Sequence, residues 1–434
     1  MNRQLGRLFA AMLMACGIAG AVGIPQATAA ELPATSSVDV QAAQPQHLVK
    51  VRKKVAASTV EVANVRDFGA VGDGTTDDTA AFQQAIAESA MMKIPVYVPM
   101  GTYKITDTLT LTKQVMTGDA HASYTADYQT LPTIVPADPA DWAIRLKDGG
   151  AISGLNFQHP TDQVTAKQFA TTVVLDGIGN RVSNVKISFP WAGIESIGEN
   201  TGRAVIQDVF ISAPARLGMR IDTGWDATRI SNVEVWTPPN VYQGAFWKSG
   251  IGIQLGHLDA FHMNNTFVFG ANVGVLLQGT DKGATWGTID GLTTDFCNVG
   301  VLSADKTLVT LTNTTHYSHV HALAITGNES RINVAGGHFR ANGNASVYIH
   351  GGYYVTIASS EMEGRAGPAL LVDGGAKVTI TGNDISANSL GVRFYGNGVI
   401  NFSNNTVVAD THSAAYASLA TNPFNQINGN IIYP

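Results

Sequence analysis

Short predicted strands recur along most of the chain at a spacing of roughly 22 residues, and this repeat constrains the fold more than any other feature. Aligning the strands by the alternation with which they end gives a set of equivalent positions. These positions are Lys186, Phe210, Glu234, Phe267, Asp295, His316, His338, Glu361, Asp384 and Thr406. The steps between them are nearly equal, except for two longer ones on either side of Phe267. One structural coil per repeat, with loops in the longer steps, would give this spacing.

Two rival folds explain the repeat less well. A doubly wound α/β fold needs helix-length periodic segments between its strands, and the sequence between the repeats is too short and too strand-like to supply them. A sandwich of two sheets would not require so regular a step. The repeat therefore predicts one elongated all-β solenoid, with the 45 glycines concentrated at its corners.

The charge composition of the chain limits the kinds of molecule that it can bind. Charged residues make up 14% of the 434 residues, against about 25% in a typical globular protein. The balance of 27 Lys and Arg against 33 Asp and Glu gives a net charge of -6, and the pI is about 6.0. Such a chain has no basic field for a polyanionic backbone, which argues against nucleic acid as a partner.

The N-terminus has the pattern of an export signal. Arg3 and Arg7 precede an apolar stretch over residues 8–24, and Ala27, Thr28 and Ala29 offer the small residues of a cleavage site. We therefore expect a signal peptide over residues 1–29 and a secreted or periplasmic protein. A lipoprotein attached through Cys16 is the alternative. No other stretch has the length of an integral membrane span.

Removal of residues 1–29 would leave Cys297 as the one cysteine, so no disulfide could form within the chain. Residues 30–59 are rich in Ala, Pro, Ser and Gln and predict a flexible linker. Residues 60–110 are expected to form a cap and the first coils, and residues 111–434 the remaining coils.

A family resemblance lies in the segment after the linker. The run from Asp67 to Ile86, followed by Val96 to Ile105, resembles the N-terminal signature of the pectate-lyase-like superfamily, which includes rhamnogalacturonase-type proteins, epimerase-like proteins and phage tailspikes. The resemblance implies a right-handed parallel β-helix, a single-stranded solenoid, whose N-terminal end is capped by a short helix. We expect that helix over residues 80–90.

The same segment carries three acids, Asp73, Asp77 and Asp78. The resemblance implies that they serve in turns and in the helix cap, with a calcium loop as the alternative. Calcium is accordingly the one cofactor that stays open; no other cofactor is expected. A trimer, as in tailspikes, is conceivable, although no coiled-coil heptads support it.

The repeat also predicts a functional surface. Apolar residues flank each aligned position, as Val233 and Val235 flank Glu234, so the aligned residue should point outward. Coils of a parallel stack lie about 4.8 Å apart, which turns the aligned positions into a row. We expect catalytic residues among five titratable members of this row: Asp295, His316, His338, Glu361 and Asp384.

Further residues should widen this row into a binding groove for a sugar chain. Glu234 belongs to the row, Trp236, Arg340 and Glu363 lie two residues beyond it, and His262 lies on a nearby loop. Carboxylates can accept hydrogen bonds from sugar hydroxyls, and aromatic rings can stack on pyranose faces. The groove therefore predicts a polysaccharide substrate, which is expected to be acidic.

The chemistry stays open between two kinds of cleavage. Hydrolysis needs two carboxyls about 5 to 5.5 Å apart for retention, or about 6.5 to 9.5 Å apart for inversion. Lyase chemistry needs a cation for a uronate carboxylate and a base for the C5 proton, which His316, His338 and Arg340 could supply. A C5 epimerase and a non-catalytic binding or exopolysaccharide assembly protein are the alternatives. No metal site is expected, because side chains spaced along a rigid stack rarely converge on one ion.

Overall fold

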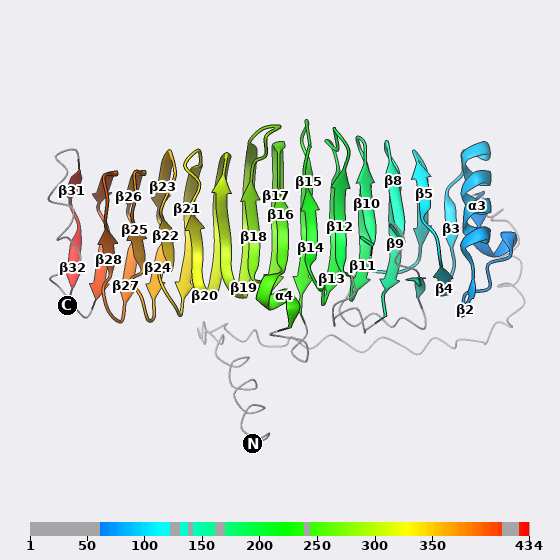
Figure 1. The fold of residues 1–434 in the computed structure, drawn as a ribbon, viewed down its shortest axis with the longest axis horizontal. Coiled ribbons are helices and arrows are strands. Elements are labelled where there is room, and N and C mark those ends of the chain that lie inside the picture. The colour runs from blue at the N-terminus through cyan, green and yellow to red at the C-terminus, as the bar shows by residue number, and fades with distance from the viewer. Residues whose placement is uncertain are drawn as a thin grey trace, which may run out of the picture. The chain divides into compact units, whose positions relative to one another are not determined.

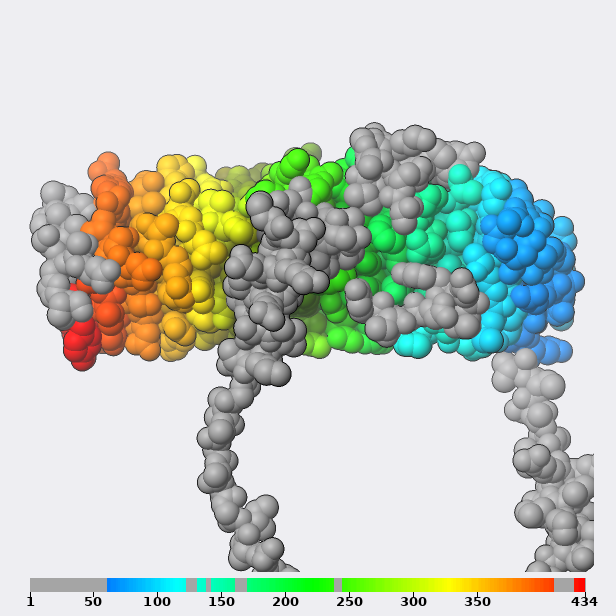
Figure 2. Space-filling view, turned by 90° about the horizontal axis from the view of Figure 1, so that it is seen from below, coloured from blue at the N-terminus to red at the C-terminus, as the bar shows by residue number. Residues whose placement is uncertain are grey.

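The computed structural model describes residues 61–121, 131–137, 142–160, 170–237, 244–409 and 425–433. These residues form a stack of parallel β-coils, which follow one another in chain order along one axis (Figures 1 and 2). The predicted all-β solenoid is therefore confirmed. The predicted signal peptide over 1–29, the alternative site at Cys16 and the linker over 30–59 lie outside the described residues. Within the described residues, no helix is long and apolar enough to cross a membrane.

Strand pairing divides each coil into three faces, which we call face 1, face 2 and face 3 in chain order. Eight strands run through faces 1 and 2 together: β9 (Ala151–Gln158), β11 (Arg181–Ser188), β13 (Val205–Ser212), β15 (Arg229–Trp236), β17 (Leu258–Phe269), β19 (Thr285–Asp305), β20 (Thr307–Ile325) and β21 (Arg331–Ala341). The ends of β19 and β20 continue into face 3.

The remaining strands belong to one face each. Face 1 also contains β1 (Ala63–Asn64), β3 (Val96–Val98), β6 (Val115–Gly118), β23 (Tyr354–Ala358), β26 (Lys377–Thr381), β29 (Val399–Ser403) and β31 (Gln426–Asn428). Face 2 also contains β2 (Asp73–Asp77), β4 (Gly101–Ile105), β7 (Pro132–Pro136), β24 (Glu361–Gly364), β27 (Asp384–Ala387), β30 (Thr406–Ala409) and β32 (Ile431–Tyr433). Face 3 contains β5 (Leu109–Thr112), β8 (Ile144–Lys147), β10 (Val173–Asp176), β12 (Ala192–Ile197), β14 (Leu217–Ile221), β16 (Ile251–Leu255), β18 (Val273–Gln278), β22 (Val347–Ile349), β25 (Leu370–Val372) and β28 (Val392–Phe394).

A helix covers the first coil. The helix α3 (Thr79–Met92) follows a short 3-10 helix, η1 (Val65–Phe68), and lies at the N-terminal end of the stack (Figure 1). It extends beyond the predicted residues 80–90 at both ends. The helix α3 is therefore the predicted capping helix. A second short helix, α4 (Ala245–Ser249), lies between β15 and β16.

The three acids of the N-terminal segment hold its turns. Asp73 accepts hydrogen bonds from the backbone N–H groups of Thr75 and Thr76, each at 2.8 Å. Asp77 accepts from the backbone N–H of Thr79 at 3.1 Å. Asp78 is the N-cap residue of α3, and its carboxylate accepts from the N–H groups of residues 71 and 72. The carboxylates of Asp73 and Asp78 therefore hold turns, and that of Asp77 binds the first N–H of α3; the Asp78 side chain makes no hydrogen bond to the helix.

In each coil from β9 onward, one residue turns the chain sharply from face 1 to face 2. It has a left-handed conformation, with φ between 46° and 70°, and we call it the left-handed corner. The corner residues are Gly154, Asn184, Asp208, Asn232, Asn265, Gly291, Asn313, Gly336, Ser359, Gly382, Asn404 and Gly429. Glycine has no Cβ to clash in this conformation, and Asn and Asp tolerate it better than other residues do. The corner therefore fixes the start of face 2 in each coil.

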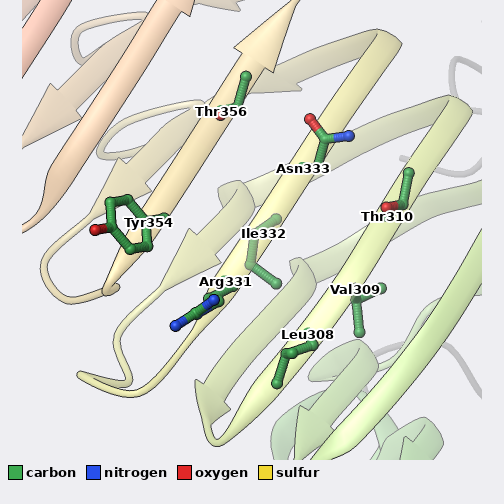
Figure 3. A pocket seen from close by; sticks show the side chains of 8 residues that line it. All are labelled: Leu308, Val309, Thr310, Arg331, Ile332, Asn333, Tyr354 and Thr356. Carbon is green, nitrogen blue, oxygen red and sulfur yellow. The ribbon is translucent and has the colours of Figure 1, made fainter.

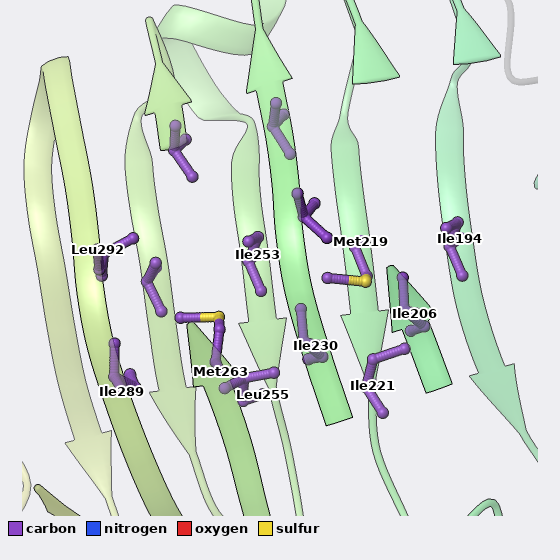
Figure 4. Close-up of a cluster of buried hydrophobic side chains, with 14 of the residues drawn as sticks. Ile194, Ile206, Met219, Ile221, Ile230, Ile253, Leu255, Met263, Ile289 and Leu292 are labelled. Atoms are coloured by element: carbon purple, nitrogen blue, oxygen red, sulfur yellow. The ribbon is translucent and has the colours of Figure 1, made fainter. Parts of the chain in front are cut away.

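The interior is a stack of apolar side chains. Ile206, Ile230 and Met263 lie at paired positions on successive strands of face 1, and Met219 and Ile253 do the same on face 3 (Figure 4). All five are at most 1% exposed. Complete burial of one such side chain contributes about 1.5 to 3 kcal/mol. Packing of this kind stabilises the described residues, among which Cys297 is a buried free cysteine and no disulfide forms.

An asparagine ladder continues the interior near the C-terminal end. The Nδ2 group of Asn383 donates to Oδ1 of Asn405 at 2.9 Å, and Nδ2 of Asn405 donates to Oδ1 of Asn430 at 3.0 Å. Asn383 also donates to the backbone carbonyl of Ile357, and it accepts from the backbone N–H of Ser360. Each amide thus satisfies backbone groups that the left-handed corner leaves unpaired.

We expect Asn232→Ala to lower the free energy of unfolding by about 1 to 2 kcal/mol, because alanine gains nothing locally to offset its left-handed conformation. The variant also loses the hydrogen bond from Asn232 Nδ2 to Asp208 Oδ1. Asn232→Gly removes the same bond without the conformational penalty, and it should cost less. Urea unfolding followed by tryptophan fluorescence measures both. An equal loss in the two variants would contradict the role of the corner.

Candidate functional site

Face 2 presents two outward columns. The first column holds the residue two positions after each corner, and the second holds the residue four positions after it. Register pairing gives the first column, from β13 onward, as Phe210, Glu234, Phe267, Thr293, Thr315, His338, Glu361, Asp384 and Thr406. The second column is Ser212, Trp236, Phe269, Asp295, Tyr317, Arg340, Glu363, Ser386 and Val408.

The C-terminal half of the predicted row is confirmed. His338 pairs with Glu361, and Glu361 pairs with Asp384, so three titratable residues follow one another in the first column. Glu234 lies in the same column four coils before His338. Trp236, Arg340 and Glu363 lie in the second column, as predicted.

The predicted position of Asp295 is wrong by two residues. Asp295 pairs with Phe269 on one side and with Tyr317 on the other, which places it in the second column. Thr293 occupies the position that the prediction gave to Asp295. Asp295 still points outward, since a shift of two residues returns a side chain to the same side of a strand.

The predicted position of His316 is wrong by one residue, and the consequence is larger. A shift of one residue reverses the direction of a side chain, so His316 points into the core and is 0% exposed. Its Nδ1 atom lies 2.8 Å from Oγ1 of Thr294, and its ring stacks on Phe339 with centroids 5.3 Å apart. Burial lowers the pKa of His316 to about 3. The structure thus gives His316 a place in the core, away from any ligand on face 2.

Irregular pairing around β19 explains both errors. The register between β19 and β20 shifts at residues 295–297 and again at 297–299. The sequence alignment made the step before Asp295 too long and the step after it too short. It therefore put Asp295 in the place of Thr293 and His316 in the place of Thr315. The corner residues carry a signal that would have prevented the error: counting two residues from Gly291, Asn313 and Gly336 gives the correct first column.

His262 lies apart from the other predicted binding residues. It pairs with Arg229 and Thr288 on face 1, and its Nδ1 atom is 3.0 Å from Oγ1 of Thr288. The left-handed corner at Asn265 separates it from the columns of face 2. The prediction that His262 widens the groove beside Glu234 is therefore wrong.

Polar side chains of neighbouring coils meet in the middle of face 2. The Tyr317 hydroxyl lies 3.3 Å from Nδ1 of His338, and the two rings meet edge to face at 5.3 Å. The Arg340 guanidinium lies 5.7 Å from the centre of the Tyr317 ring. Nε2 of His338 is shielded from solvent and has no hydrogen-bond partner among the described residues. This nitrogen therefore lacks the hydrogen-bond partner that a buried polar atom normally has.

Carboxylates surround this group. Oε2 of Glu361 lies 3.8 Å from Nε2 of His338, and Oε2 of Glu363 lies 3.5 Å from Nε of Arg340. Glu363 also pairs with Arg365 at 2.8 Å through its other oxygen. Glu363 thus holds the Arg340 guanidinium in place over face 2. We call Asp295, Tyr317, His338, Arg340, Glu361 and Glu363 the face 2 cluster.

Aromatic rings cover the coils before the face 2 cluster. The ring of Phe269 lies 6.4 Å from those of Trp236 and Phe267, and 5.4 Å from that of Phe296. The sequence prediction included Trp236 and missed Phe269, Phe296 and Tyr317 as members of the site. Correct register would have placed Phe269 and Tyr317 on either side of Asp295.

Burial shifts the pKa of two carboxyl groups on this face. It raises the pKa of Asp295, although a hydrogen bond from the backbone N–H of Phe296 opposes the shift. It also raises the pKa of Glu234. A carboxyl with a raised pKa keeps its proton to higher pH, which suits a general acid. In the described part of the chain, no three His, Cys, Asp or Glu side chains converge on a point that could hold a metal ion.

Comparison with known proteins agrees with this geometry at the level of the fold. Residues 62–138 match the family described as rhamnogalacturonase A/epimerase, pectate lyase-like, and residues 264–432 match the right-handed β-helix region. The N-terminal fragment of the bacteriophage Phi29 gene product 12 has a similar structure, with a TM-score of 0.62 and 15% identity over 89% of this chain and 73% of that one. The Dettilon tailspike protein has a TM-score of 0.52 and 14% identity, over 86% of this chain and 68% of the tailspike.

A short segment of the chain is also similar to mannuronan C5-epimerases. The chain is 56% identical over 43 residues to the mannuronan C5-epimerase AlgE1 of Azotobacter vinelandii. The match covers 10% of this chain and 3% of the epimerase. The chain therefore spans a small part of the length of that relative. Fold and family matches together show a pectate-lyase-like, right-handed parallel β-helix protein.

The buried position of His316 predicts a specific dependence of stability on pH. Below pH 6.5 the unfolded chain gains a proton on this residue that the folded chain cannot accept, since burial has lowered the folded pKa to about 3. The His316 proton should therefore lower the free energy of unfolding by about 1.4 kcal/mol for each pH unit below pH 6.5. His316→Leu should show a slope smaller by this amount between pH 6 and pH 4, roughly the window set by the two pKa values. Equal slopes in urea unfolding would contradict burial of a neutral histidine.

Proposed function

We propose that the protein is an enzyme that acts on an extracellular acidic polysaccharide, and that it cleaves the chain by β-elimination at a uronic acid bound on face 2. The observation that carries the proposal is the arrangement of Tyr317, His338 and Arg340. It combines an imidazole nitrogen that has no hydrogen-bond partner among the described residues, a hydroxyl beside the ring, and a cation. These groups match the needs of proton removal beside a carboxylate.

Each group has a separate role in this chemistry. Arg340 binds the uronate carboxylate and neutralises its charge, which makes the neighbouring C5 proton more acidic. When Nδ1–H of His338 donates to the Tyr317 hydroxyl, Nε2 is left with a free lone pair that accepts the C5 proton. The electron pair of the C5–H bond then forms the C4–C5 double bond as the C4–O bond breaks.

The departing oxygen needs a proton, and we assign its donation to Asp295. It lies next to Tyr317 in the second column, two coils before Arg340, and burial raises its pKa. Successive coils lie about 4.8 Å apart, so a sugar chain that follows the column would place adjacent units against successive coils. Trp236 and Phe269 would stack against units further along.

Hydrolysis has less support from the same residues. Glu361 and Asp384 lie on adjacent coils, and both are exposed, without the burial that keeps a general acid protonated. The two carboxyls with raised pKa, Glu234 and Asp295, lie in different columns and two coils apart. The coil carrying Phe267 and Phe269 lies between them.

C5 epimerisation is the second candidate, and the short match to mannuronan C5-epimerases favours it. It begins with the same removal of the C5 proton and ends with return of a proton to the opposite side of the ring. The C4–O bond stays intact in this reaction. The same three residues, Tyr317, His338 and Arg340, would serve both reactions.

Incubation with mannuronan, polygalacturonate and a neutral glucan tests the proposal. We expect ultraviolet absorbance from an unsaturated product with an acidic substrate and none with the glucan. His338→Gln and Arg340→Gln should each lower kcat/KM by about 10² to 10⁴, because each removes a group needed in the transition state. Product is followed by absorbance and by chromatography of the released oligosaccharides.

Arg393→Gln is the matched control, since Arg393 is an exposed arginine on β28 of face 3. It should retain full activity. A changed epimer ratio without chain cleavage would support the second candidate. New reducing ends without unsaturation, or full activity in both face 2 variants, would contradict the proposed reaction.

A further inference from the structure

Face 1 carries a strip of exposed apolar and aromatic side chains on successive coils. Trp286 pairs with Leu308, Leu308 with Arg331, and Arg331 with Tyr354. Trp286, Leu308 and Tyr354 are 44%, 45% and 46% exposed. A neighbouring ring, Tyr353, is 47% exposed and meets Tyr354 edge to face at 4.6 Å. Exposed apolar side chains that lie next to one another commonly mark a binding surface.

Two cations lie against the tyrosine pair. The Arg331 guanidinium lies 5.1 Å from the ring centre of Tyr353 and 5.4 Å from that of Tyr354. Nζ of Lys377 lies 5.3 Å and 5.2 Å from the same two rings. Neither cation forms an ion pair with a carboxylate in the described part of the chain. Their positive charge is therefore free for an anion, on a chain whose net charge is -6.

A shallow depression of about 280 Å³ opens beside Arg331 (Figure 3). Leu308, Arg331 and Tyr354 lie along one side of it. A polar row follows on the same three strands, β20, β21 and β23, because Thr310 pairs with Asn333 and Asn333 with Thr356. Hydroxyl and amide groups thus stand beside an aromatic ring and a cation on rigid strands.

We propose that this strip of face 1 is a second binding surface, which holds a segment of an acidic polysaccharide. Tyr354 would stack on a sugar ring, and Arg331 and Lys377 would pair with carboxylates of the chain. Thr310, Asn333 and Thr356 would exchange hydrogen bonds with sugar hydroxyls. Backbone pairing holds all of these residues in place, so little ordering is needed when the chain binds.

The polar row argues for a sugar chain over a second copy of the protein. Contact between two apolar surfaces would remove water from Thr310, Asn333 and Thr356, and would leave their polar atoms unpaired at a cost. A ligand rich in hydroxyl groups satisfies these atoms. The unpaired cations select an acidic chain over a neutral one.

The two surfaces lie on different sides of the left-handed corner. The face 2 cluster begins after each corner residue, whereas the strip ends before it. This second surface does not depend on the reaction proposed for face 2, because it would hold the same kind of polymer without changing it. Binding and turnover can therefore be tested separately.

Affinity for mannuronan is measured by isothermal titration in low salt, with dextran as the neutral probe. The Arg340→Gln background lowers the contribution of face 2. In this background, Arg331→Gln combined with Lys377→Gln should weaken mannuronan binding roughly tenfold, and the loss should shrink in high salt. Tyr353→Ala combined with Tyr354→Ala should weaken binding to a similar degree. Arg393→Gln, on face 3, is the matched control and should bind as its parent does.

Three outcomes would overturn the proposal. Unchanged mannuronan affinity in both double variants is the first, and equal affinity for dextran and mannuronan is the second. The third is an oligomer in sedimentation velocity that the tyrosine variant converts to monomers, which would make the strip an interface between copies. Failure of the face 2 reaction has a different signature, since turnover would be absent while the binding difference between these variants remained.

Discussion

Parallel backbone pairing between successive coils determines which residues lie next to one another on every face of the solenoid. Each strand takes its register from the coil before it, and the spacing of about 4.8 Å turns equivalent residues into columns. Like charges in register would face each other at this short distance along the whole stack, which destabilises a sheet. A charged content of only 14% keeps the number of such pairs small. Glu361 and Asp384 are an exception, because two exposed carboxyls stand in register on adjacent coils.

The exception identifies face 2 as a surface that serves something other than stability. Acids, a histidine and an arginine gather there within a few coils, and Nε2 of His338 has no hydrogen-bond partner among the described residues. Such an arrangement is costly to the folded protein and is useful to a ligand. The strip on face 1 differs in kind, since it consists of aromatic rings, a leucine and cations beside a row of small polar side chains.

The fold could be predicted from the sequence because the repeat records the length of a coil. The order of residues in a column could be predicted only where the steps are regular. His338, Glu361 and Asp384 follow one another at equal steps and lie where they were predicted. Pairing is irregular near Phe296 and Cys297, and there the alignment slipped by two residues at Asp295 and by one at His316. A slip of one residue in the alignment moves a side chain from the surface to the core, so periodicity alone could not decide the role of His316.

The left-handed corner has a consequence for how such a protein can change. It occupies a single residue in each coil, and the two strands beside it are fixed in length by pairing on both sides. Additional residues are accommodated elsewhere, as between β15 and β16, where the chain makes a detour through α4 before it rejoins face 3. Insertions and deletions can therefore reshape the rim of face 2 while every column keeps its order. Changes in the loops can therefore alter what face 2 admits, while the columns themselves stay unchanged.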